Sequence, residues 1–166
     1  GYNQEWSTEL EVRQAQDEYI KAWCALKVLS KVYGFGDPDG FVFNMSVGYD
    51  LEGIKGEKVN SYIDNMMHAE NTPQFKECLE VLTELFPEER AFIAGISPRV
   101  SRSVTVSTLH GCLPQEIERI ASYFLTEKGL HTFVKCNPTI LGYKTARTIL
   151  DSMGYDYIVF DEHHFN

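Results

Sequence analysis

The sequence lacks the features that mark membrane and nucleic-acid-binding proteins. No apolar run approaches the roughly 20 residues of a membrane-spanning helix, and the first residues do not have the pattern of a signal peptide. Positive charge is scarce, since 15 Lys and Arg stand against 24 Asp and Glu, for a net charge of -9. An acidic protein repels phosphate backbones and anionic lipid. We therefore expect neither nucleic acid nor a membrane as a partner.

Cysteine is scattered, which excludes local metal and cluster motifs. No two cysteines form a Cys-x-x-Cys pair, so a zinc knuckle and an iron–sulfur ligand run are absent. Without secretory signs, such cysteines indicate reduced thiols in the cytoplasm.

The segment Asp161–His164 (DEHH) contains residue types that often bind metal ions. Adjacent side chains on an extended segment point to opposite faces, so we predict no metal site there.

Nucleotide signatures are also missing. The glycine-rich segment GFGDPDG precedes a predicted strand, whereas a dinucleotide fingerprint follows a strand and opens a helix. The chain has neither a P-loop nor an HExxH motif.

The composition is that of a globular protein. The chain has 166 residues, of which 43% are hydrophobic, and this is enough for one domain with a hydrophobic core. It begins with Gly1 rather than Met, and we expect a piece of a longer protein.

The apolar periodicity predicts an α/β protein. A long N-terminal helix ends near Gly34, a buried strand and two helices follow, and after Pro87 the order becomes strand, helix, strand, helix, strand. Short turns between these elements predict a parallel sheet with right-handed crossovers. The predicted strands are 41–47, 103–109, 131–135 and 156–160, and the later helices are 59–69, 75–86, one from Pro114, and 144–153.

Reactive groups in parallel α/β folds collect at the carboxyl ends of the strands. Polar residues concentrate at these ends here. Ser46 stands at the polar exit of the first strand, and Cys112 follows the second in STLHGC. A thiol of depressed pKa could relay protons there, and His110 titrates near neutrality. The alternative is that Cys112 is a buried small apolar residue and His110 an ordinary loop histidine.

Lys135 ends the third predicted strand and is followed by Cys-Asn-Pro. Its ammonium is a compact charge that could hold an anionic ligand or the electron-rich part of a cofactor. Asn137 adds an amide, and Pro138 stiffens the turn. Two alternatives remain open for Lys135: a surface lysine that extends its ammonium into solvent, or a Schiff-base lysine of an aldolase-like barrel.

Several stretches together resemble a known family. They are GYNQEWSTEL, GYDLEGIK, STLHGCLPQEIERIASYFLTEKGLHTFVKCNPTILGY and DYIVFDEHHF. They resemble the large (FAD and iron–sulfur) subunit of the family called "putative selenate reductase", a relative of dihydropyrimidine dehydrogenase and dihydroorotate dehydrogenase. The resemblance covers nearly the whole chain, residues 1–166, which we interpret as a single domain. It is loosest over 71–102, a possible insertion.

The resemblance implies a (β/α)8 TIM barrel that binds FMN, with FAD, NAD(P)H and iron–sulfur modules elsewhere on the parent polypeptide. In flavin-barrel relatives a strand ends in Lys-Leu-x-Pro-Asn, and its lysine contacts the flavin ring. Lys135 stands at that place, with Asn137 beside it, and Ser46 is a further cofactor-binding candidate. Cys112 would be the catalytic proton donor or acceptor, although it is displaced from the relatives' Asn-x-Ser-Cys-Pro. Asp161–His163 replaces the relatives' Thr-Asn-Thr, and its acidic pair would repel a reduced flavin.

Four predicted strands amount to about half of a dihydroorotate-dehydrogenase-like barrel, preceded by a long helix. The loops after the last two strands supply the phosphate site of such barrels, so we expect weak or no FMN binding by this piece. The unpaired edge strands of half a barrel can pair with those of a second copy, so we expect a homo-oligomer.

We expect the chain to be a fragment of a flavin-dependent oxidoreductase subunit that is inactive alone. Its expected partners are the other domains of the parent polypeptide and redox subunits. The alternative is a scaffold or subunit-docking domain that has lost flavin.

Overall fold

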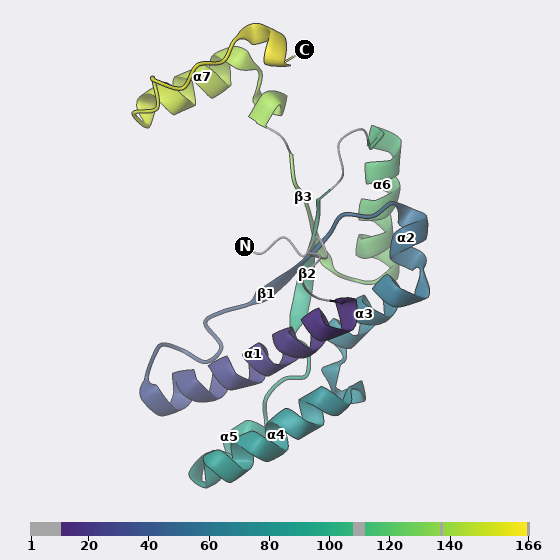
Figure 1. Ribbon diagram of the computed structural model, residues 1–166, viewed down its shortest axis with the longest axis vertical. Helices are drawn as coiled ribbons and strands as arrows, with labels where there is room; N and C mark the ends of the chain where they lie inside the picture. The colour runs from purple at the N-terminus through teal and green to yellow at the C-terminus, as the bar shows by residue number, and fades with distance from the viewer. Residues whose placement is uncertain (1–10, 108–111, 137, 166) are drawn as a thin grey trace. The chain divides into compact units, whose positions relative to one another are not determined.

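The computed structural model describes residues 11–107, 112–136 and 138–165. The chain divides into two compact units, Gly1–Val134 and Lys135–Asn166. The first contains a parallel sheet and its helices, and the second is a small helical unit (Figure 1). Each unit is described separately below.

The sheet of the first unit has three parallel strands in the order β1-β2-β3. The strands are β1 (Phe43–Val47), β2 (Ser101–Val106) and β3 (His131–Val134). The register shifts once, between Phe43 and Asn44. The buried Ser101 hydroxyl donates to the Phe43 carbonyl at 2.7 Å and so satisfies the backbone at this irregularity. The predicted parallel sheet is confirmed.

Helices connect the strands and cover one face of the sheet. Helix α1 ends at Gly34, whose φ of 68° is the left-handed conformation that glycine adopts readily. Helix α4 begins at Pro73, whose missing N–H costs nothing in a first turn. The helices are α1 (Val12–Tyr33), α2 (Leu51–Lys55), α3 (Glu57–Met67), α4 (Pro73–Leu85), α5 (Arg90–Ala94) and α6 (Pro114–Ser122), which continues as a π-helical turn (Tyr123–Glu127); single 3₁₀ turns lie at Ala69–Asn71 and Pro87–Glu89.

The core lies between the helices and the sheet. Met45 and Val47 of β1 and Val104 and Val106 of β2 are buried and share this face, because β1 and β2 pair Met45 with Val104 and Val47 with Val106. Burying each such side chain contributes about 1.5–3 kcal/mol. The helices complete the core with Ile20, Trp23, Val28, Ile54, Tyr62, Ile63, Met66, Ile120 and Phe124.

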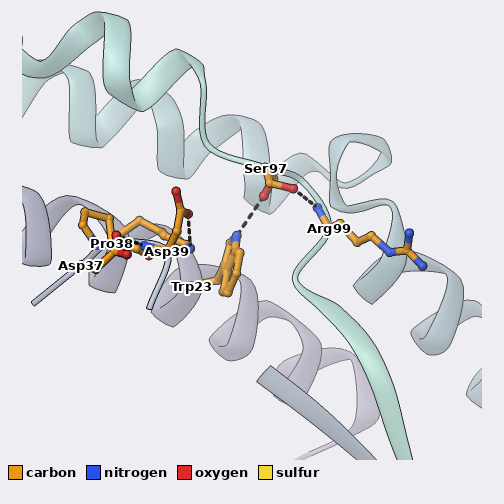
Figure 2. A network of polar contacts seen from close by, with 7 residues as sticks. Trp23, Asp37, Pro38, Asp39, Ser97 and Arg99 are labelled. Atoms are coloured by element: carbon orange, nitrogen blue, oxygen red, sulfur yellow. Dashed lines mark hydrogen bonds and ion pairs between the residues drawn. The ribbon is translucent and has the colours of Figure 1, made fainter. Parts of the chain in front are cut away.

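A buried lysine attaches the loop before β1 to α1. The Lys27 ammonium donates to the Pro38 carbonyl at 2.6 Å and to Asp39 Oδ1 at 2.8 Å. Figure 2 shows Pro38 and Asp39 close to Trp23. It also lies 4.2 Å from the ring centroid of Trp23 and 4.7 Å from that of Phe41. The lysine side chain is buried, whereas Asp39 is 89% exposed. We call this group, Lys27 with Trp23, Pro38, Asp39 and Phe41, the lysine clamp.

Trp23 connects the lysine clamp to the segment before β2. Its indole Nε1 donates to the Ser97 carbonyl at 2.9 Å (Figure 2). A buried indole needs such an acceptor because its N–H would otherwise lose its hydrogen bond to water. One helix thus fixes the approach to both β1 and β2.

The second unit is built around α7 (Tyr143–Ser152), with 3₁₀ turns at Pro138–Leu141 and Glu162–Phe165. Arg147 is its central contact. Its guanidinium donates to Asp151 Oδ1 at 2.7 Å, to the Ile158 carbonyl at 2.7 Å and to the Tyr155 carbonyl at 2.8 Å. It also lies 4.6 Å from the ring centroid of Phe160. Arg147 therefore holds the segment that follows α7.

The prediction of a strand at 156–160 is wrong. The segment forms no strand, and Val159 is 97% exposed. A strand needs a neighbour for its backbone hydrogen bonds, and within the described residues of the second unit there is none. The carbonyls of Tyr155 and Ile158 accept from Arg147 instead. The described sheet therefore has three strands rather than the four expected.

Other expectations differ in detail or stay predictions. Strand β1 begins two residues later than predicted, β2 begins at Ser101 rather than Ser103, and Lys135 follows β3 rather than ending it. The insertion at 71–102 and the homo-oligomer stay predictions. No helix among the described residues has both the length and the apolar character needed to cross a membrane.

Candidate functional site at the strand ends

The carboxyl ends of β1 and β2 lie side by side. Ser46 pairs with Thr105 and Val47 with Val106, and the Ser107 N–H donates to the Val47 carbonyl at 2.8 Å, which extends the ladder by one residue. Because successive strand residues alternate between faces, Ser46 and Thr105 lie on the face opposite Met45 and Val104. Ser46, a predicted cofactor-binding residue, is half-buried and lies beside the hydroxyl-bearing Thr105.

Polar side chains continue along this face of the sheet. The Asn44 amide donates to the Thr105 hydroxyl at 2.8 Å, across the two strands. Strand pairing places Ser103 beside both Asn44 and His131, and Thr105 beside both Ser46 and Phe133. We define the polar sheet face as the side opposite the helices, made of Asn44, Ser46, Ser103, Thr105, His131 and Phe133.

The loop after β1 is attached to α6. Asp50 caps α2 by accepting from the Gly53 N–H at 2.8 Å, and Glu116 of α6 accepts from the Leu51 N–H at 3.0 Å. The other Glu116 oxygen accepts from Arg119 at 3.0 Å, which orients the carboxylate. A carboxylate at a helix N-terminus is favourable because the helix dipole is positive there. The end of β1 is therefore fixed relative to the start of α6.

Cys112 lies just before α6, and its side chain is half-buried. The preceding residues 108–111, which include His110, lie outside the described residues. A catalytic role for Cys112 therefore stays a prediction.

Lys135 directly follows β3 and is exposed. It opens the second unit, and Asn137 lies outside the described residues. Their roles in binding a cofactor stay predictions. In the same unit the exposed side chains of Asp161 and His163 contact each other through Asp161 Oδ1 and His163 Nδ1, within the segment that contains the predicted acidic pair.

Sequence reasoning missed most of the polar sheet face. It singled out Ser46 but not Asn44, Ser103 or Thr105. The available signal was the alternation of polar and apolar residues in Asn-Met-Ser-Val and Ser-Val-Thr-Val, which has the period of a strand with two different faces. We interpreted 41–47 as a buried strand because apolar residues dominate it, and 103–109 as a strand because β-branched residues dominate it.

The clearest pKa shifts lie away from this site, in α1 and α4. Burial raises the pKa of the Cys24 thiol from 9.0 to about 12. Below about pH 9 the folded and unfolded thiols are both neutral, so the stabilisation is fully present. Between pH 9 and about 12 only the unfolded thiol ionises, so stability falls as pH rises, by at most about 1.4 kcal/mol per pH unit.

We therefore expect alkali to destabilise the chain more than a Cys24→Ala variant. From about pH 8 to about pH 10, the free energy of unfolding should fall by about 1 kcal/mol more in the unchanged chain. Urea unfolding at both pH values, followed by circular dichroism, measures the difference. Alanine binds no proton, so equal losses in the two proteins would contradict a raised Cys24 pKa.

The comparisons with known proteins identify the domain. The family model described as "Oxidoreductase YgfK, N-terminal TIM-barrel domain" matches residues 1–166. The chain belongs to this family. Its parallel sheet with covering helices is therefore a partial TIM barrel, as predicted.

Curated relatives agree with the family match. The chain is 45% identical over 181 residues to "Putative oxidoreductase YgfK" of Escherichia coli strain K12, and equally to the protein of that name in strain O157:H7. The alignment covers 99% of this chain but 18% of each relative. No solved structure matches. The oxidoreductase family of the prediction is confirmed, and its flavin and selenate parts stay predictions.

Proposed function

We propose that this YgfK-type barrel domain holds a flavin for electron transfer in a larger oxidoreductase. The observation that carries the proposal is the polar sheet face. In a TIM barrel the side of the sheet away from the helices is the barrel interior, where bulky branched apolar residues usually dominate. Here that side carries Asn44, Ser46, Ser103 and Thr105. A barrel with a polar interior next to its strand ends is suited to a polar ligand.

The chemistry of these groups fits FMN. A flavin ring offers carbonyl and ring-nitrogen acceptors and an N–H donor, and the hydroxyls of Ser46 and Thr105 can both donate and accept. When bound, a flavin supplies hydride and electron transfer. By the resemblance alone, Lys135 and Asn137 are further candidates for binding a flavin, and Lys135 directly follows β3. Phosphate anchoring would come from later strands.

The wider assignment rests on the same resemblance and on length. Because the chain spans 18% of the length of its curated relatives, those relatives have room for further modules. We propose that electrons pass from NAD(P)H through FAD and iron–sulfur clusters in those modules to the barrel flavin. Selenate is a candidate electron acceptor only because the family that the sequence resembles is called "putative selenate reductase". Cys112, just before α6, is the candidate proton donor or acceptor.

The test is the visible absorption spectrum of a longer chain that spans the whole barrel of this family. We expect a flavin spectrum in the purified protein. Lys135→Ala should weaken FMN binding about tenfold, because a charged hydrogen bond contributes about 1.5–3 kcal/mol. Lys144→Ala is the matched control, since Lys144 is an exposed lysine of α7, and it should leave the affinity unchanged.

The alternative function is a scaffold or subunit-docking domain that has lost flavin. It is favoured by the acidic segment at Asp161 and Glu162, whose side chains are exposed and would repel a reduced flavin. A colourless longer chain that also fails to bind added FMN would overturn the flavin proposal and leave this alternative. A yellow chain whose affinity is equal in Lys135→Ala and Lys144→Ala would keep the flavin and remove Lys135 from its site.

A further inference from the structure

A cleft of about 680 Å³ opens among the helices α1, α3 and α4. Its volume is in the range of small-molecule sites, and most of the side chains that line it carry amide, hydroxyl or charged groups. These helices cover the side of the sheet opposite the polar sheet face. The cleft is therefore separate from the strand ends, and the flavin proposal makes no use of it.

Gln16 of α1 supplies a buried hydrogen-bond donor to this cleft. The residue lines the cleft and is 8% exposed, and its Oε1 accepts from Asn65 Nδ2 at 2.9 Å. This bond orients the amide, because the oxygen faces Asn65 and the nitrogen Nε2 is left as a donor. Within the described part of the chain Nε2 has no acceptor. Buried donors are rarely left unpaired, so this one indicates a ligand with an acceptor oxygen.

The starts of α1 and α4 border the same cleft. The two helices pack together and run in the same direction (Figure 1). Arg13 and Gln74 are second residues of these helices, so their backbone N–H groups have no acceptor within the helix, and both residues line the cleft. Neither first turn contains an acidic residue. Two partly positive helix ends therefore face this cleft together.

Charged side chains of both signs stand on the rim of the cleft. Arg13 and Lys58 are positive, Glu11 and Glu57 are negative, and all four are exposed. None of them forms an ion pair with any residue that the structure describes. Because these charges cancel, the helix ends and the Gln16 donor decide the preference of the cleft. Both favour an oxyanion, and a guanidinium matches carboxylate and phosphate groups well.

We propose that this cleft binds a small molecule through a carboxylate or phosphate group at the starts of α1 and α4. Its donors are Gln16 Nε2, the Arg13 guanidinium and the Gln74 N–H. The polar rest of the molecule would contact the amides of Asn65 and Asn71, which line the same cleft. The site does not depend on the flavin proposal, so either can fail without the other.

The test is isothermal titration calorimetry of the chain at low ionic strength, with inorganic phosphate and with succinate as separate probes. We expect saturable binding of at least one of them in the millimolar range, and none of uncharged glycerol. Tighter binding of phosphate indicates a phosphate-bearing ligand, and tighter binding of succinate indicates a carboxylate. No binding of either anion well above millimolar concentrations would overturn the proposal.

Surface variants distinguish this site from a general attraction of anions. Arg13→Gln should weaken binding about fivefold, whereas Glu57→Gln should strengthen it about twofold because it removes a repelling charge. Lys31→Gln is the matched control, since Lys31 is exposed in the last turn of α1, and it should leave the affinity unchanged. Equal affinities of the Arg13→Gln and Lys31→Gln proteins would overturn the proposal.

A buried variant tests the donor itself. Gln16→Glu has nearly the same shape and still accepts from Asn65, but it replaces the Nε2 donor by a carboxylate oxygen. It should weaken anion binding at least about tenfold, and an unchanged affinity would exclude Gln16 from the site and overturn the proposal as stated. If this variant does not fold, the exposed variants of Arg13 and Glu57 still decide the outcome.

Discussion

Replacing Phe124 by alanine is expected to lower the free energy of unfolding by about 3–5 kcal/mol. Phe124 is 0% exposed and lies in the π-helical turn between α6 and β3. Its ring packs 5.5 Å from that of Tyr123, centroid to centroid, and its carbonyl accepts from the Leu130 N–H at 2.9 Å, just before β3 begins. The substitution removes a large apolar side chain and leaves a cavity where a helix meets the sheet. Urea unfolding followed by circular dichroism measures the loss.

The neighbouring residue provides the control for Phe124. Leu125 belongs to the same turn but is 55% exposed. Leu125→Ala should change the free energy of unfolding by no more than about 0.5 kcal/mol, as surface substitutions usually do. If both variants lose the same amount, the turn does not bury Phe124 as described. A large loss confined to Phe124 would support the crossover from α6 into β3.

Lys27→Ala is the second substitution with a large expected effect, a loss of about 2–4 kcal/mol. It removes the buried stem, the donor to the Pro38 carbonyl, and the cation between the rings of Trp23 and Phe41. The ion pair with Asp39 adds little, because that carboxylate is exposed. Thermal and urea unfolding of the variant measure the total contribution of the lysine clamp.

A second variant separates charge from packing in the lysine clamp. Lys27→Met keeps an apolar stem of similar length but leaves the Pro38 carbonyl without its donor, so we expect a smaller loss of about 1–2 kcal/mol. Lys31→Ala, one turn later on the exposed face of α1, should be nearly neutral. A Lys27→Met protein as stable as the unchanged chain would show that the ammonium contributes nothing and that packing alone holds the loop.

The cofactor-binding assignments depend on the sequence more than on the structure. The place of Lys135, Asn137 and Ser46 at predicted strand ends indicates them, and the resemblance to a flavin-barrel motif adds to the case for Lys135 and Asn137. The structure adds to Ser46 the neighbours Asn44 and Thr105, which belong to the polar sheet face. These neighbours could not be paired from the sequence, because the register of two strands separated by several helices has no local signal.

The sequence by itself determined the local elements. It placed the end of α1 at Gly34 and the starts of α4 and α6 close to Pro73 and Pro114, because helix caps and first-turn prolines act within a few residues of one another. It also determined that the strands are parallel, because short turns between alternating strands and helices allow few other ways to connect the strands.

The tertiary structure alone decided what depends on distant partners. Tyr155 to Phe160 has the β-branched and aromatic composition of a strand, yet it follows α7 as an irregular segment held by Arg147. The burial of Lys27 against Pro38 and the hydrogen bond of Trp23 to Ser97 also join residues that carry no mutual signal in the sequence. The physical reason is the same in each case. Strand pairing and the burial of charged or polar groups depend on which groups the packed chain brings together, whereas turns and caps depend on the nearest few residues.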